Sequence, residues 1–268
     1  MVKFSRTAMD STACSYAYMA PAEPSMDEVA SQAKIVSRTV AKRFDGVLPA
    51  KRAFDIAVAA IALAVLFPFM LLVAIIIKLE SRGPVLFVQE RIGLNRRRAD
   101  RRAKDVTIRH DGRSGRDRRS RPNDGRPFRI YKFRTMVQNA EAAGPALARA
   151  NDPRITRLGR LMRKTRVDEI PQFINVLKGD MSIVGPRPER SYFIDKVSQK
   201  VPEFTMRLMV KPGITGLAQV EDGYTTSVDE MQGKLFYDLK YIANFSLAQE
   251  IKILLKTFYV ILTGKGAC

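Results

Sequence analysis

The stretch FDIAVAAIALAVLFPFMLLVAIIIK, Phe54 to Lys78, is the strongest structural signal in the sequence. From Ile56 to Ile77 it contains no charged residue, and it is about as long as the ~20 residues that a helix needs to cross a bilayer. Pro68 lies near its middle, where a proline breaks or kinks a helix. We therefore predict a membrane helix with a break at Pro68.

Two topologies of this helix fit the sequence. Basic residues lie on both sides of it: Arg38, Lys42, Arg43, Lys51 and Arg52 before it, and Lys78, Arg82 and Arg91 after it. The positive-inside rule disfavours moving either flank across the membrane. A broken helix that enters and leaves on the cytoplasmic face keeps both flanks inside, whereas a simple spanning helix does not. Because many spanning helices contain a proline, these residues leave both topologies open.

The charge of the chain indicates an anionic partner. The 268 residues include 46 Lys and Arg against 27 Asp and Glu, a formal net charge of +19. A hydrophobic content of 46% is sufficient for a folded core. Nucleic acid, an anionic membrane surface and a phosphorylated substrate all satisfy this charge, which does not choose among them.

Cysteine and histidine usage argues against several kinds of site. Cys14 and Cys268 lie near the termini without a CxxC spacing, so neither a zinc site nor a disulfide framework is expected. His110 is the single histidine and lies in a hydrophilic basic stretch, which argues against a Ser-His-Asp triad. A cytosolic redox environment fits this composition.

The sequence divides into three parts. Residues 1–49 have mixed polarity and are expected to be a mobile N-terminal tail, with one short helix from Met26 to Arg43. Residues 50–80 contain the apolar helix. Residues 81–268 are predicted to form a compact domain.

A β-hairpin is expected at the start of this domain. GPVLFVQERIG, Gly83 to Gly93, and RPFRIYKFRTM, Arg126 to Met136, are rich in aromatic and β-branched residues. A basic insertion at 95–126 separates them: from Arg96 to Arg126, 13 Lys and Arg stand against 5 Asp. This composition predicts disorder at the hairpin tip. A solvated loop and a contact with nucleic acid or anionic lipid both fit the insertion.

Beyond Asn151 the sequence predicts mainly helices. ITRLGRLMRKT, from Ile155, has apolar residues at helical spacing, and EIPQFINVLKG, from Glu169, ends at Gly179, a natural helix stop. SLAQEIKILLKTFYVIL, from Ser246, is also predicted to be helical. Its apolar stripe is expected to lie in the core rather than at a membrane, and consists of Leu247, Ile251, Leu254, Leu255 and Phe258.

Asp168 and Glu169 form a pair of acidic residues within a basic run. Asp168 can be the N-cap of a helix over 169–178, with Pro171 in the first turn. It can also be a nucleophile or a metal ligand. Neighbouring cations are expected to favour its carboxylate form, namely Arg160, Arg163, Lys164 and Arg166.

Two loops rich in glycine and proline follow this pair: SIVGPRP, Ser182 to Pro188, and KPGITGLAQ, Lys211 to Gln219. Neither matches a known nucleotide-binding fingerprint. They fit ordinary turns between helices, and also rigid turns that aim Arg187 or backbone amides at a ligand.

Taken together, seven motifs in this order resemble the bacterial sugar transferase family, the small monotopic phosphoglycosyl transferases. The motifs are KRAFDIAVA, GPVLFVQERIG, FRIYKFRTM, DPRITRLGRLMRKT, VDEIPQFINVLKGDMSIVGPRP, KPGITGLAQV and DLKYIANFSL. The similarity extends from Lys51 to Thr263, apart from the insertion. It implies an α+β, helix-dominated fold with an N-terminal re-entrant membrane helix, a small β-hairpin and a compact cytoplasmic catalytic domain with amphipathic interfacial helices.

The resemblance also implies a reaction. Such enzymes transfer a sugar 1-phosphate from a nucleoside diphosphate sugar, usually a uridine diphosphate sugar, to polyprenyl (undecaprenyl) phosphate, and release a nucleoside monophosphate. This is the first membrane step of exopolysaccharide or glycoconjugate assembly. The expected location is the cytoplasmic face of the bacterial inner membrane, with anionic lipids as partners and no nucleic acid. The sugar and the oligomeric state are not predicted.

Residue roles follow from the same resemblance. Asp168 corresponds to the nucleophile that forms an aspartyl phosphosugar, Glu169 to the second member of the acidic pair, and Mg²⁺ is expected beside Asp168. Arg187 corresponds to a phosphate contact. Further candidates for the substrate phosphates are Arg134, Lys132 and Arg163, and candidates for a nucleotide loop are Gly213, Thr215, Gly216 and Gln219.

The sequence departs from the family at a few positions. Tryptophan, frequent in the family where this chain has Leu217 and Phe245, is absent, and Phe67 precedes Pro68 where a serine is common. Two other functions fit the sequence. A membrane-tethered nucleic-acid binder would not depend on Asp168. A membrane hydrolase would pass the phosphate to water from the same aspartate.

Overall fold

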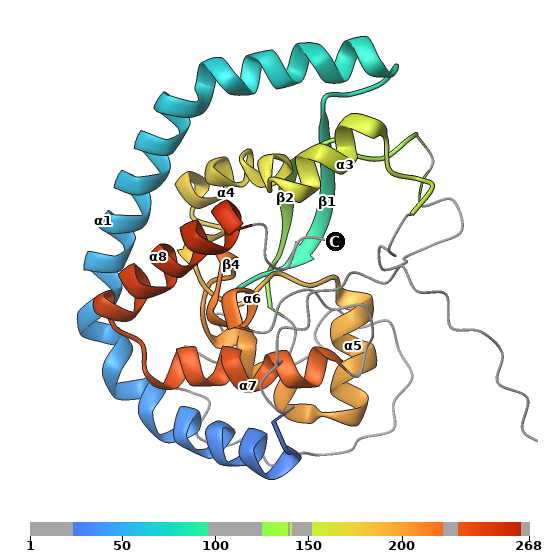
Figure 1. Cartoon of the computed structure of the whole chain (residues 1–268). Coiled ribbons are helices and arrows are strands. Elements are labelled where there is room, and N and C mark those ends of the chain that lie inside the picture. The colour runs from blue at the N-terminus through green and yellow to red at the C-terminus, as the bar shows by residue number, and fades with distance from the viewer. Residues whose placement is uncertain (1–23, 96–124, 139, 141–151, 222–229, 264–268) are drawn as a thin grey trace, which may run out of the picture.

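The computed structural model describes residues 24–95, 125–138, 140, 152–221 and 230–263. Residues 1–23 of the N-terminal tail and residues 96–124 of the basic insertion lie outside these residues, as do His110 and both cysteines. The predictions made for them therefore stay predictions. The described chain is mainly helical with two small sheets (Figure 1).

Helix α1, Met26–Glu80, is 55 residues long and arches around the other elements, from the bottom of the view up the left and over the top (Figure 1). Ser25 caps its start: the Ser25 hydroxyl accepts a hydrogen bond from the Glu28 amide, and the Glu28 carboxylate accepts one from the Ser25 amide. The expected boundary at residue 49 is wrong, because residues 26–49 are helical and continuous with the apolar segment. The expected break at Pro68 is also absent. The helix continues through Pro49 and Pro68, each of which removes one backbone hydrogen bond.

The apolar part of α1 is largely exposed in the isolated protein. Leu48–Glu80 is long and apolar enough to cross a membrane, and only 11% of its most apolar window is buried. The exposed large side chains include Ile61, Val65, Phe67, Leu71, Leu72, Ile75 and Leu79. A core helix of a soluble protein would bury such residues, so this surface indicates contact with lipid.

The predicted hairpin is confirmed. Strand β1, Leu86–Ile92, pairs antiparallel with β2, Pro127–Phe133, in a register from Leu86 opposite Phe133 to Ile92 opposite Pro127. Asn175 covers the other edge of β2: its side-chain oxygen accepts from the Tyr131 amide at 3.1 Å and its amide group donates to the Arg129 carbonyl at 2.7 Å. The side chain thus replaces a neighbouring strand and fixes β2 to the helix that carries Asn175.

The remaining elements follow in short succession. They are α3 Arg157–Lys164, the 3₁₀ helix η1 Val167–Glu169, α4 Gln172–Lys178, β3 Ser182–Val184, α5 Ser191–Lys200, the 3₁₀ helix η2 Pro202–Met209, β4 Gly213–Thr215, α6 Leu217–Glu221, α7 Glu230–Ala243 and α8 Leu247–Thr263. Gly179 ends α4 with φ of 86°, as predicted. Strands β3 and β4 form a parallel pair within the two glycine-proline segments, which the sequence analysis interpreted only as loops.

The outward face of α8 contradicts the prediction of a core stripe. Ile251, Leu255 and Phe258 are exposed, whereas Glu250 and Ile253 are buried. The helix therefore turns its acidic residue inward and most of its large apolar residues outward. This orientation is typical of a helix that lies on a membrane surface.

A buried polar cluster explains why Glu250 points inward. Lys51 of α1 forms an ion pair with Glu250 of α8 at 2.5 Å, and lies 3.4 Å from the Asp55 carboxylate. The same Asp55 oxygen accepts hydrogen bonds from the Ser182 hydroxyl and the Ile183 amide, at 3.0 and 3.1 Å. The Tyr241 hydroxyl of α7 donates to Glu250. These bonds attach the start of the apolar segment to β3, α7 and α8.

Removing Glu250 should strongly destabilise the fold. Glu250→Ala leaves Lys51 buried beside Asp55 alone, and breaking a buried ion pair in this way costs about 3–5 kcal/mol. The matched control is Glu221→Ala, which breaks the more exposed pair with Lys256 and should cost about 0–1 kcal/mol. Denaturant unfolding in detergent, followed by circular dichroism, measures both. Equal losses for the two variants would contradict a dominant role for the buried cluster.

Candidate active site

The acidic pair lies in the turn between α3 and α4. Arg166 has φ of 58° and is the one non-glycine residue with a positive φ in the described ranges. This left-handed turn directs the chain into η1, where Asp168 and Glu169 are both 7% exposed. Asp168 is not a helix N-cap, contrary to expectation, since α4 starts only at Gln172. Strained backbone and buried carboxylates together are typical of a functional site.

Glu169 is held by two cations from different elements. Lys132 of β2 donates to its Oε1 at 2.7 Å, and Arg187 of the loop after β3 donates to the same oxygen at 2.9 Å. Burial alone would raise the pKa of Glu169, but Arg187, Lys132 and Arg166 outweigh it and hold the pKa well below its usual range. Glu169 is therefore an anion that fixes two positive side chains beside its neighbour.

The Asp168 carboxylate differs from that of Glu169 in its contacts and in the direction of its pKa shift. Within the described part of the chain, its carboxylate accepts no hydrogen bond and forms no ion pair. Burial, and then the negative charge of Glu169, raise its pKa, although Lys132, Arg163 and Arg187 oppose this rise. The expectation that surrounding cations favour the charged form of Asp168 is thus not met, because burial and Glu169 together outweigh them. Asp168 keeps an unpaired carboxylate beside three cations.

The four predicted phosphate-binding residues separate into two groups. Lys132, Arg163 and Arg187 converge on the acidic pair from β2, α3 and the loop after β3. Arg163 is further oriented by a 3.0 Å hydrogen bond from its Nε to the Thr135 hydroxyl. Arg134 instead bonds to the end of α1. Three basic side chains around a carboxylate can neutralise a diphosphate.

Arg134 caps the C-terminus of α1. Its guanidinium donates to the Ser81 carbonyl at 2.7 Å, to the Ser81 hydroxyl at 2.9 Å and to the Arg82 carbonyl at 3.0 Å. The carbonyls at a helix C-terminus lack partners within the helix and carry the negative end of its dipole. Arg134 therefore secures the end of α1 to the end of β2, and its role in binding phosphate stays a prediction.

The predicted nucleotide-loop residues pack behind the active site. A Cβ on Gly213 would lie 2.1 Å from the Gly185 nitrogen, and one on Gly216 would lie 2.3 Å from the Gly185 oxygen. Thr215 bonds Thr257 of α8 at 2.7 Å, and Gln219 donates to the Ile214 carbonyl at 3.2 Å. These glycines permit the close approach of β3 and β4 that supports the loop carrying Arg187. Their role in nucleotide binding stays a prediction.

Sequence reasoning missed one buried charged pair near this loop. Arg207 of η2 and Asp238 of α7 are 6% and 2% exposed and lie 2.8 Å apart. The sequence does indicate that Asp238 is buried, because it lies among the apolar positions Leu235, Leu239 and Ile242 of α7. The partner could not be inferred, since no pattern links segments so far apart in the chain.

Comparison with known proteins identifies the family. A family model described as bacterial sugar transferase matches residues 47–104 and 105–264. The chain belongs to this family. The match includes the acidic pair, the Arg187 loop and the buried network of α1, so these features lie within the family domain of the bacterial sugar transferases.

Several relatives have informative names. An Aeromonas hydrophila UDP-N-acetylgalactosamine-undecaprenyl-phosphate N-acetylgalactosaminephosphotransferase is 44% identical over 217 residues, 81% of this chain and 44% of the relative. A Caulobacter vibrioides UDP-glucose:undecaprenyl-phosphate glucose-1-phosphate transferase is 39% identical over 219 residues, 81% of this chain and 71% of the relative. A Rhizobium leguminosarum exopolysaccharide production protein is 39% identical over 223 residues, 97% of the relative. The chain thus spans less than half of the Aeromonas relative but nearly all of the Rhizobium relative.

The two carboxylates should affect stability in opposite directions at neutral pH. Because the folded protein raises the pKa of Asp168, its ionised form is disfavoured on folding, and this penalty is present above the folded pKa and disappears below the unfolded value of 3.8. Asp168→Asn should therefore raise Tm at pH 7, with a gain that shrinks as the pH falls towards 4. Glu169→Gln loses two ion pairs and should lower Tm.

Thermal unfolding between pH 4 and 8 in the presence of a chelator tests both variants without bound cations. A lower Tm for Asp168→Asn at pH 7 would contradict the assignment of a raised pKa. An unchanged Tm for Glu169→Gln would contradict the role of Glu169 in holding Lys132 and Arg187.

Proposed function

We propose that this bacterial sugar transferase moves a sugar 1-phosphate from a uridine diphosphate sugar to undecaprenyl phosphate through an aspartyl phosphosugar intermediate. The observation that carries this proposal is the asymmetry of the acidic pair. Glu169 is bonded by Lys132 and Arg187, while the Asp168 carboxylate beside it has no hydrogen-bond or ion-pair partner among the residues that the structure describes. The printed names of the Aeromonas and Caulobacter relatives supply the substrate classes.

The chemistry proceeds in two displacements at one phosphorus. An Asp168 oxygen attacks the phosphate that bears the sugar, and the bond to the bridging oxygen breaks, so that uridine monophosphate leaves. An oxygen of undecaprenyl phosphate then attacks the same phosphorus and restores the Asp168 carboxylate. Lys132, Arg163 and Arg187 stabilise the charge on the nonbridging oxygens, and low exposure at Asp168 limits attack by water.

A Mg²⁺ ion fits this site. The described residues contain no group of three or more His, Cys, Asp or Glu side chains that could hold a metal by themselves. Mg²⁺ commonly takes one or two carboxylates and completes its coordination with water and substrate phosphates, and Asp168 offers one unpaired carboxylate. We propose that Asp168 holds Mg²⁺ together with the donor diphosphate. When bound, the ion neutralises charge on that diphosphate.

The membrane arrangement is proposed from both ends of the apolar segment. At its start, Lys51 and Asp55 bond to α8 and β3; at its end, Ser81 accepts a hydrogen bond from Arg134, the residue directly after β2. A domain on one side of a bilayer can hold both ends only if the helix enters and leaves on that side. We therefore propose a re-entrant helix that bends within the bilayer, on the cytoplasmic face of the bacterial inner membrane. The exposed apolar face of α8 lies at the same interface.

Asp168→Asn should abolish turnover in detergent-solubilised protein. The amide cannot act as the nucleophile, so uridine monophosphate release should fall by at least ~10³-fold, whereas loss of an electrostatic contact alone typically costs less. Mass spectrometry of the parent protein, incubated with the donor and without the lipid, should show a phosphosugar increment on the peptide containing Asp168. Retained activity in Asp168→Asn would refute the assignment. Turnover of the donor without any lipid acceptor would favour a hydrolase.

The topology can be tested with single cysteines near Ala50 and near Gly83, in a variant without Cys14 and Cys268. A re-entrant helix places both positions in the cytoplasm, so neither should react with an impermeant thiol reagent in intact cells, and both should react after lysis. A control cysteine in an exported protein verifies access of the reagent to the outer face. Labelling of only one position in intact cells would indicate a spanning helix.

A further inference from the structure

The loop that carries Arg187 is held through its carbonyl groups. Pro186 and Pro188 lack an N–H, so the loop has few donors with which to fix its own conformation. Each carbonyl from 186 to 189 instead accepts a hydrogen bond from outside: Pro186 from the Gly213 amide at 2.9 Å, Arg187 from Arg207 at 3.0 Å, Pro188 from Arg91 at 3.1 Å and Glu189 from the Ile92 amide at 2.9 Å. The orientation of the loop thus depends on donors in other elements.

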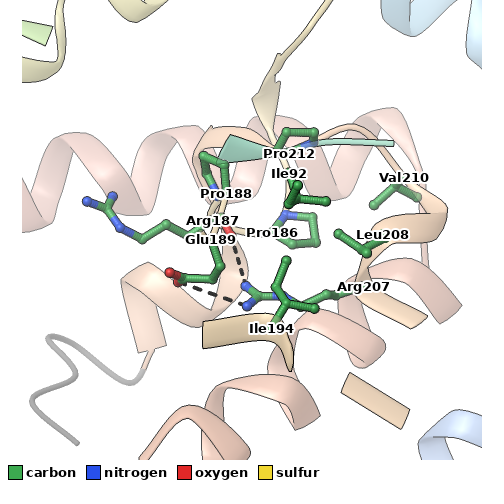
Figure 2. A pocket seen from close by; sticks show the side chains of 10 residues that line it. All are labelled: Ile92, Pro186, Arg187, Pro188, Glu189, Ile194, Arg207, Leu208, Val210 and Pro212. Atoms are coloured by element: carbon green, nitrogen blue, oxygen red, sulfur yellow. Dashed lines mark hydrogen bonds and ion pairs between the residues drawn. The ribbon is translucent and has the colours of Figure 1, made fainter. Parts of the chain in front are cut away.

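Arg207 acts at the residue that reaches the active site. Figure 2 shows the Arg187 side chain extending away from the small pocket behind the loop, while Arg207 approaches the Arg187 backbone from within that pocket. The Arg187 guanidinium meets Glu169 at 2.9 Å, and its carbonyl meets Arg207 at 3.0 Å. The two contacts lie at opposite ends of one residue. A shift of the carbonyl therefore shifts the guanidinium.

Arg207 is itself fixed on several sides. Its Nη2 lies 2.8 Å from Asp238, its Nη1 lies 4.0 Å from Glu189, and the guanidinium lies 4.7 Å from the centre of the Phe204 ring. Burial raises the pKa of Asp238 to about 6, a rise that Arg207 and Lys234 oppose. Asp238 is thus predominantly charged at neutral pH. A buried arginine with a charged partner has one preferred position, because its planar fork satisfies several acceptors at once.

We propose that Arg207, held by Asp238, is a positioning residue that fixes the Arg187 carbonyl and thereby aims the Arg187 guanidinium at Glu169 and the donor diphosphate. Arg207 itself touches neither the acidic pair nor, on this view, the substrate. The kinetic test of this inference rests on the proposed function, in which Arg187 stabilises the charge on the donor phosphates.

A double-substitution experiment separates positioning from general stabilisation. Arg207→Lys retains the charge beside Asp238, but it lacks the rigid, planar guanidinium whose Nη2 lies 2.8 Å from Asp238 and donates to the Arg187 carbonyl. Because misplacement of a contact by about 1 Å can cost up to ~10²-fold in rate, we expect kcat/KM for uridine monophosphate release to fall about 10- to 100-fold. In an Arg187→Ala background the same substitution should cost less than about 2-fold, because the side chain that Arg207 positions is gone.

Two controls accompany these variants. Ile253→Val removes one buried methylene from α8 and calibrates the effect of a modest loss of stability on kcat/KM. Asp238→Asn should reproduce the Arg207→Lys effect, because it removes the partner that holds the guanidinium. The inference would be overturned if Arg207→Lys lowered kcat/KM by the same factor in the parent and Arg187→Ala backgrounds. It would also be overturned if Ile253→Val, at the same Tm as Arg207→Lys, lowered kcat/KM by the same factor.

Hydrogen exchange supplies a measurement that needs no turnover. In Arg207→Lys, backbone amides of residues 185–190 should exchange faster, while those of α8 should keep their parent rates. Unchanged exchange in the loop would overturn the positioning role, whether or not the protein is active. If the parent protein releases no nucleoside monophosphate from any sugar nucleotide but the loop still loosens, the proposed function fails and the positioning role stands.

Discussion

The ion pair between Lys51 and Glu250 determines where the long helix leaves the folded domain. Both groups are almost completely buried, so each is stable only with the other in place. Asp55, one turn further along α1, bonds β3, and β3 leads directly into the loop of Arg187. The same cluster therefore sets the path of α1 and the base of the loop that carries Arg187, and a displacement of one would displace the other.

Charge at the acidic pair is distributed unequally by the fold. Two adjacent carboxylates in a buried turn repel each other, and two of the three nearby cations, Lys132 and Arg187, bond to Glu169. The remaining carboxylate is costly to keep ionised, which is the condition of a group that gains from meeting a metal ion or an electrophilic phosphorus. In the proposed reaction, the stability lost at Asp168 is thus linked to its attack on phosphorus.

Local patterns predicted local structure well. The hairpin, α3 and the Gly179 stop follow from aromatic and β-branched composition, helical spacing and a helix-ending glycine, which are properties of neighbouring residues. The β3–β4 pair, the outward face of α8 and the capping role of Arg134 depend on contacts between distant segments, and these overrode the local signals. The pKa of Asp168 was mispredicted for the same reason, because counting nearby cations ignores burial and ignores which carboxylate the cations reach.

The hairpin is closed by hydrogen bonds at the end where the basic insertion leaves and returns. Beyond the last strand pair, Gly93 donates to the Arg126 carbonyl at 3.0 Å and Arg126 donates to the Leu94 carbonyl at 3.2 Å, so the chain departs and returns at adjacent points. The entropic contribution to the free energy of closing a loop grows only slowly, by about 0.6 kcal/mol for each doubling of the loop length. This end of the hairpin can therefore accept segments of very different length, including a whole reporter domain, with little effect on the core. Length variation among proteins of this architecture should concentrate there.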